Sequence, residues 1–149
     1  MWMSQEISRG RSLDTFQASI NTFTLSRERV IGALKLLRYL EILRELLLLS
    51  ELEKVTVDVE SILMEDIPHK AEILKYIRKV FNRWVNVPEV KELKIEAGIP
   101  EGGLNSHIFI IAKFRDSEKA VDLSEELEYQ LLSADPKISN RIVVYSLFG

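Results

Sequence analysis

Histidine and cysteine, the residues that most often bind metals or act as catalytic bases and nucleophiles, are scarce in this chain. Cysteine is absent, and histidine occurs twice, as His69 and His107. No His-Glu-x-x-His or related spacing exists, so the signature of a zinc hydrolase is missing. His107 is expected opposite Glu96 or Ala97 in a predicted hairpin and could bind a cation there, but a surface or interface histidine is the commoner case. We therefore expect no metal and no other cofactor.

Other patterns also fall short of a catalytic or phosphate-binding site. Ser106 precedes His107, but neighbours in a strand point to opposite faces and cannot act as nucleophile and base. The glycine-bearing segment 97–103 lacks the lysine and the following helix of a phosphate-binding loop, so its glycines indicate a hairpin turn. The last predicted helix carries many carboxylates, typical of a solvated face: Glu118, Asp122, Glu125, Glu126 and Glu128. We expect no catalytic residues.

A small-molecule or metal sensor, or an enzyme, is the alternative function. It would use the polar residues of the predicted sheet face around His107. The candidate ligand-binding residues are His107, Asp58, Glu60, Glu96 and Tyr145. They contain no complete set of nucleophile, base and orienting group, so a binding module is the preferred interpretation.

Charge and aromatic content argue against nucleic acid as a partner. The net charge is −3 and the sequence pI is about 5.5, whereas a general phosphate binder must carry positive charge. The segment from His107 to Phe114 matches the RNA-binding RNP1 pattern only at Phe109 and Phe114, and loosely at His107. Val55–Glu60 supplies no stacking aromatic residue. We predict no binding of nucleic acid.

The composition is that of an ordinary soluble globular protein, with 46% hydrophobic and 29% charged residues. The beginning of the sequence lacks an apolar stretch of the length found in secretory signals. The most apolar run, Leu46 to Leu49, is far shorter than the roughly 20 residues that span a bilayer. We expect a cytoplasmic protein that does not bind membranes.

The segment from Val55 to Leu147 predicts strand, helix, strand, strand, helix, strand. The expected elements are a strand over Val55–Glu60, a helix opening near Asp66 with Pro68 in its first turn, a strand around Leu93 and Ile95, a strand over Ile108–Phe114, a helix from Asp116 or Ser117 that Pro136 ends, and a strand over Ile142–Phe148. This order is typical of the ferredoxin-like split βαβ unit, an α+β fold with its first and third strands central and both helices on one face. We expect residues 54–148 to form this βαββαβ unit.

A long helix is predicted before the sheet. Residues 1–24 are polar and mixed, and we expect a flexible N-terminal arm. Residues 25–149 form one α+β domain, in which Ser26 caps a helix over residues 27–49. The apolar residues of this helix cover more of its circumference than one sheet face needs.

The surplus apolar surface indicates a dimer or larger homo-oligomer, with a further protein partner possible. One seam contains Leu36, Leu40, Leu43 and Leu47, and a second contains Ile42, Leu46 and Leu49. One seam should face the sheet and the other a partner, but the pattern does not say which. The expected oligomer interface is therefore Leu36, Leu40, Ile42, Leu43, Leu46 and Leu47.

Two further surfaces bear on this interpretation. The sheet face away from its helices should carry Phe109, Ile111 and residues of the last strand, an apolar patch that the long helix, either of the same chain or of a partner, is expected to cover. The first helix of the βαββαβ unit is basic, with Lys75 and Lys79, and the last is acidic, so modest attraction between them is predicted beside the simpler reading of solubility. The preferred function is a non-catalytic protein-interaction or regulatory module.

Overall fold

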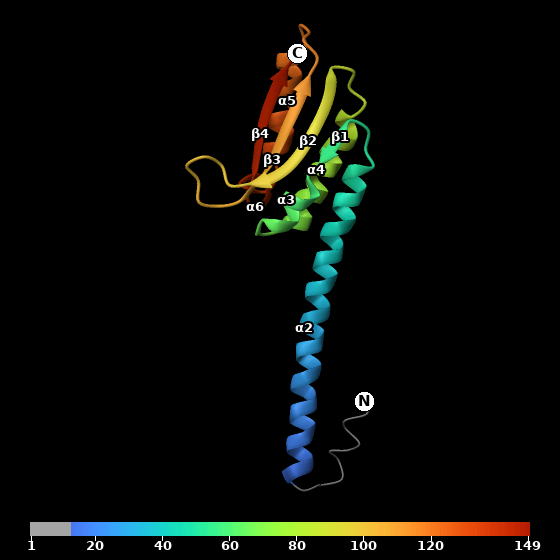
Figure 1. The fold of residues 1–149 in the computed structure, drawn as a ribbon, viewed down its shortest axis with the longest axis vertical. Helices are drawn as coiled ribbons and strands as arrows, with labels where there is room; N and C mark the ends of the chain where they lie inside the picture. The colour runs from blue at the N-terminus through green and yellow to red at the C-terminus, as the bar shows by residue number, and fades with distance from the viewer. Residues whose placement is uncertain (1–12) are drawn as a thin grey trace. The chain divides into compact units, whose positions relative to one another are not determined.

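The computed structural model describes the backbone of residues 13–149 and the side chains from residue 26 onward. It is a mixed α+β structure with a long helix before a four-stranded sheet, as the sequence predicts (Figure 1). The chain divides into two compact units, residues 1–40 and residues 41–149. The described residues of the first unit all belong to the long helix. Among the helices described, none combines the length and the apolar character needed to cross a membrane.

The elements confirm the predicted alternation of strands and helices. Along the chain they are α2 (Leu13–Ser50), β1 (Val55–Val57), α3 (Val59–Met64), α4 (Lys70–Trp84), β2 (Val90–Gly98), β3 (His107–Phe114), α5 (Ala120–Leu132), α6 (Pro136–Ser139) and β4 (Ile142–Phe148). Several boundaries differ from the sequence prediction. Pro68 precedes α4 instead of lying in its first turn, and Pro136 opens the short helix α6.

Helix α2 starts well before its predicted first residue. The prediction placed Ser26 as the cap, but α2 runs from Leu13 and Ser26 lies inside it. Residues 13–31 contain neither proline nor glycine, so nothing in that stretch ends a helix. Of the predicted flexible arm, residues 1–12 lie outside the described residues, and residues 13–24 belong to α2.

Strand β1 is shorter than its alternating valines predict. It ends at Val57, and Val59 begins helix α3. The Asp58 side chain accepts a hydrogen bond from the Ser61 backbone N–H at 3.2 Å, which caps α3. An Asp cap stabilises a helix start, and here it outweighs the continued alternation of the strand.

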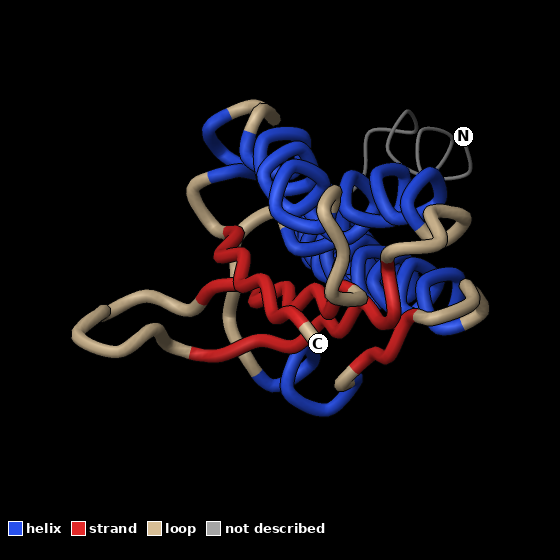
Figure 2. Tube along the Cα trace, turned by 90° about the horizontal axis from the view of Figure 1, so that it is seen from above, coloured by secondary structure: helices blue, strands red, loops and turns tan. Residues whose placement is uncertain are grey.

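The strand order differs from that of a split βαβ unit. The order is β1-β2-β3-β4, with β1 parallel to β2, β2 antiparallel to β3, and β3 parallel to β4. The predicted central pair, the first and third strands, is therefore replaced by β2 and β3, and the ferredoxin-like arrangement is not confirmed. The loop that joins β2 to β3 projects away from the sheet (Figures 1 and 2).

Helices α4 and α5 cover one face of the sheet with a continuous apolar core. The inward residues of the two central strands are Val90, Leu93, Ile95, Ile108, Ile110, Ala112 and Phe114, and all are fully buried. From the helices come Ile73, Ile77, Phe81, Leu127 and Leu131. Leu46 and Leu49, near the end of α2, belong to the same core. Each such side chain stabilises the fold by about 1.5 to 3 kcal/mol when removed from water.

Candidate functional site

The opposite sheet face, which we call the open face, carries an apolar half on β3 and β4. It consists of Phe109, Ile111, Val143, Tyr145 and Leu147, which alternate along their strands with the residues that point toward the helices. Tyr145 and Leu147 are each half exposed. The Phe109 and Tyr145 rings are stacked, with centroids 6.1 Å apart and planes inclined by 16°. The predicted apolar patch is therefore present, and it provides a flat contact surface.

The other half of the open face is charged but internally neutralised. Lys113 Nζ lies 3.1 Å from Glu92 Oε1, and Lys94 Nζ lies 3.6 Å from Glu96 Oε2. Thr56 Oγ1 also donates to Glu92, at 3.1 Å. The hydrogen bonds from Lys113 and then Thr56 lower the pKa of the Glu92 carboxyl below its usual value. These charges satisfy one another and leave no free acid or base aimed at a ligand.

Three of the predicted ligand-binding residues share this face but do not converge. His107 begins β3 opposite Gly98, while Glu96 lies opposite Phe109. Tyr145 belongs to β4 and pairs with Ile111. The His107 Nδ1 atom lies 2.8 Å from the Asn105 carbonyl oxygen, which can only accept, so Nδ1 carries a proton in this contact.

The remaining two, Asp58 and Glu60, belong to the start of α3. Asp58 caps the helix through Ser61, and its own backbone N–H donates to the Ile95 carbonyl at 2.9 Å. Glu60 is exposed in the first turn. Among the side chains from residue 26 onward, no three His, Cys, Asp or Glu residues lie close enough together to hold a metal ion.

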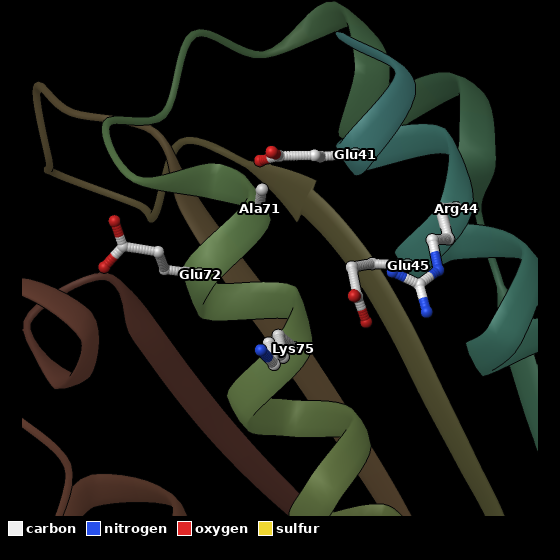
Figure 3. A pocket seen from close by; sticks show the side chains of 6 residues that line it. All are labelled: Glu41, Arg44, Glu45, Ala71, Glu72 and Lys75. Carbon is white, nitrogen blue, oxygen red and sulfur yellow. The ribbon is translucent and has the colours of Figure 1, made fainter. Parts of the chain in front are cut away.

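A hollow of about 260 Å³ lies between α4 and the part of α2 in the second unit (Figure 3). Its lining residues are Glu41, Arg44, Glu45, Ala71, Glu72 and Lys75. Arg78 Nε donates to Glu45 Oε1 at 2.7 Å, and Lys137 Nζ lies 3.2 Å from Glu72 Oε2. The Glu45–Arg78 pair was not predicted from the sequence. The sequence did contain one indication of this pair. Glu45 directly precedes Leu46, and a carboxylate beside a buried residue needs a partner for its charge.

Helices α4 and α5 are joined by neutral contacts. Tyr76 donates its hydroxyl hydrogen to the Gln130 carbonyl, and Trp84 Nε1 donates to the Gln130 side chain at 2.8 Å. Among the described side chains, no ion pair connects these two helices. Lys79 and Arg83 instead flank a shallow groove of about 230 Å³ beside Tyr76. The predicted attraction between the basic helix α4 and the acidic helix α5 is thus not supported by an ion pair between their described side chains.

The two seams of α2 have different surroundings. The six predicted interface residues are Leu36, Leu40, Ile42, Leu43, Leu46 and Leu47. Leu46 is 2% exposed and Ile42 packs against the core, so this seam faces the domain's own interior. Leu47 is 59% exposed, and Leu36 and Leu40 are about as accessible, at 57% and 48%. The seam that contains Leu36, Leu40 and Leu47 is therefore the exposed one.

Comparison with known proteins yields one relative without an assigned activity. An uncharacterised protein of Methanocaldococcus jannaschii is 29% identical to this chain over 99 residues, which cover 65% of the chain and 81% of that protein. No family model matches the chain, and no solved structure matches it. The similarity extends over most of that protein, whose name gives no substrate or partner.

Proposed function

We propose that this chain is a non-catalytic interaction or regulatory module that self-associates through the exposed seam of α2. The observation that carries the proposal is the accessibility of large apolar side chains on this helix. Those about half exposed include Val30, Ile31, Leu34, Leu36, Leu37, Leu40 and Leu47. A contiguous apolar surface of this kind is uncommon on monomers and is a mark of interfaces.

The spacing of three exposed leucines and the partly buried Leu43 favours a second copy of this chain as the partner. Leu36, Leu40, Leu43 and Leu47 follow one another at intervals of four, three and four residues. This is the heptad spacing with which α-helices pack side by side in coiled coils. The identical seam on another copy offers the same spacing, so one symmetric contact would bury all of these leucines twice.

The energetics support this assignment. Burying one leucine fully contributes about 1.5 to 3 kcal/mol. Several leucines from each chain would offset the cost of association, which is about 4 to 15 kcal/mol. The charges along the helix alternate in sign, with Arg38, Glu41 and Arg44 spaced by three residues. An interleaved pattern suits the border of a protein contact better than a membrane surface, which favours lysine and arginine alone.

The test compares two double variants. Leu40→Glu/Leu47→Glu places charges on the exposed seam and should leave a folded protein of lower mass by light scattering. Ile42→Glu/Leu46→Glu, the matched control, places charges in the core and should unfold the second unit by circular dichroism. A wild type that is monomeric at high micromolar concentration would contradict the proposal. So would an unchanged mass in the Leu40→Glu/Leu47→Glu variant.

A further inference from the structure

Strand β4 leaves one row of its backbone groups unpaired along the edge of the sheet. The Ile108 N–H donates to the Arg141 carbonyl at 2.7 Å, and the Gly149 N–H donates to the Phe114 carbonyl at 3.0 Å. In a parallel ladder every second residue of a strand bonds to the same neighbour, so the odd-numbered residues of β4 bond to β3. The even-numbered ones direct their N–H and C=O groups outward: Ile142, Val144, Ser146 and Phe148.

The β4 edge lacks the proline, charged side chains and bulges that commonly prevent an edge strand from pairing with a strand of another chain. Strand β4 has seven residues, with no proline or charged side chain among them, and its register against β3 shows no bulge. The opposite edge, β1, is only three residues long and is protected by its shortness. Within residues 13–149, no strand pairs with the outer edge of β4, which lies at the margin of the sheet in Figure 1.

We propose that β4 pairs with β4 of a second copy, antiparallel, about a twofold axis at Tyr145. This position of the axis overlaps the two strands along their whole length. It sets Val144 opposite the partner's Ser146, and Ile142 opposite the partner's Phe148. All of these residues direct their backbone groups outward, so the register of greatest overlap is also one in which the hydrogen bonds can form.

The side chains of the open face match in the same register. Val143 meets the partner's Leu147, and Tyr145 meets the partner's Tyr145, so every cross-strand pair on this face is apolar or aromatic. Such pairs stabilise neighbouring strands. No charged residue of β4 is brought against its own copy. This self-complementarity is what selects a second copy of the chain over a different protein.

The pairing would give a continuous sheet of both copies, with the apolar halves of their open faces joined. It rests on the proposed function only in adding a second contact to the same self-association, one that joins each copy to a different neighbour than the α2 seam does. The α2 seam and the β4 edge are separate surfaces, so each can be removed by substitution without touching the other.

Single cysteine variants test the pairing, because the chain has no cysteine of its own. At the axis, opposed residues that are not hydrogen-bonded have Cα atoms about 4.5 Å apart, within reach of a disulfide. Tyr145→Cys should therefore give a disulfide-linked dimer under mild oxidation. In Leu147→Cys the two thiols lie four residues apart along the strand, about 13 Å, so its yield should be about tenfold lower.

Two results would overturn the β4 pairing. The first is equal cross-linking of Tyr145→Cys and Leu147→Cys, or no cross-linking of either. The second is preferential cross-linking of Ile111→Cys, which lies one strand inside the edge. That outcome would mean that the open faces of two copies pack against each other, or that another contact places β3 of one copy beside β3 of the second.

The same variant separates this inference from the α2 proposal. Tyr145→Cys in the Leu40→Glu/Leu47→Glu background should still cross-link, since the α2 seam is not part of the strand contact. If Leu40→Glu/Leu47→Glu lowers the mass but Tyr145→Cys does not cross-link, the strand pairing fails and the α2 proposal stands. If Tyr145→Cys cross-links but Leu40→Glu/Leu47→Glu leaves the mass unchanged, the α2 proposal fails and the strand pairing stands. Circular dichroism of each variant confirms that it is folded.

Discussion

The Nε atom of Arg78 lies 2.7 Å from the Glu45 Oε1 atom and ties the end of α2 to α4. The Glu45 side chain is 8% exposed and that of Arg78 is 26% exposed, so the carboxylate depends on this partner more than the guanidinium does. Removing the guanidinium would leave a buried carboxylate without its hydrogen bond. A carboxylate in that position destabilises the folded state more than the loss of a surface ion pair would.

Arg78→Met should accordingly lower the free energy of unfolding by about 1 to 3 kcal/mol, measured by chemical denaturation. Lys79→Met is the matched control, because Lys79 is exposed on the next position of the same helix, and its effect should stay within about 0.5 kcal/mol. Equal losses in the two variants would show that the Glu45–Arg78 pair contributes nothing specific.

The contact between α4 and α5 predicts a second stability effect. Trp84 is 4% exposed, and its Nε1–H donates to Gln130 Oε1. Gln130→Ala leaves the indole N–H without an acceptor and should cost about 1 to 3 kcal/mol of unfolding free energy. Gln130→Glu retains an acceptor at the same place, and in high salt, which screens the repulsion between its carboxylate and that of Glu126, it should cost less. If Gln130→Glu is as destabilising as Gln130→Ala, the loss comes from other contacts of this residue.

The local elements were predictable from the sequence, whereas their pairing was not. The alternation of Val55 and Val57 predicts β1, the nearly unbroken apolar run from Ile108 to Phe114 predicts β3, and the turn residues after β2 predict a hairpin. Alternation, however, reports only which face a side chain lies on and is the same whichever strand lies beside it. The placement of β1 beside β2 instead of β3 depends on contacts between segments distant in sequence. Both orders satisfy the same local pattern.

The candidate interface was predictable in composition but not in orientation. Apolar residues occur on both sides of α2, so the sequence named two seams without assigning either. The assignment follows from Leu46 and Leu49, which enter the core, while Leu47 points away from it. The neutralised charges of the open face could not be foreseen either, because Lys113 and Glu92 meet only through the register of β2 and β3.

The lowered pKa of Glu92 predicts a small acid sensitivity. A carboxyl whose pKa is lowered on folding stabilises the protein above its ordinary pKa of 4.5. This contribution is lost as the pH falls through the lower pKa of the folded state. The difference in unfolding free energy between wild type and Glu92→Gln should therefore shrink below about pH 4.5 and be smaller in high salt.

Single-stranded RNA should bind weakly or not at all at physiological salt. RNA-binding sheets with similar elements stack bases on exposed aromatic residues of their central strands. Here the central strand β2 presents Glu92 and Glu96 to the open face, and the Phe109 ring is already stacked on Tyr145. A phosphate backbone would meet these carboxylates, and a base would have to replace the Tyr145 ring.

Fluorescence anisotropy of a labelled oligonucleotide should show no saturation at micromolar protein. A micromolar complex that Phe109→Ala weakens, with Leu104→Ala as the exposed control, would mean that the open face binds bases.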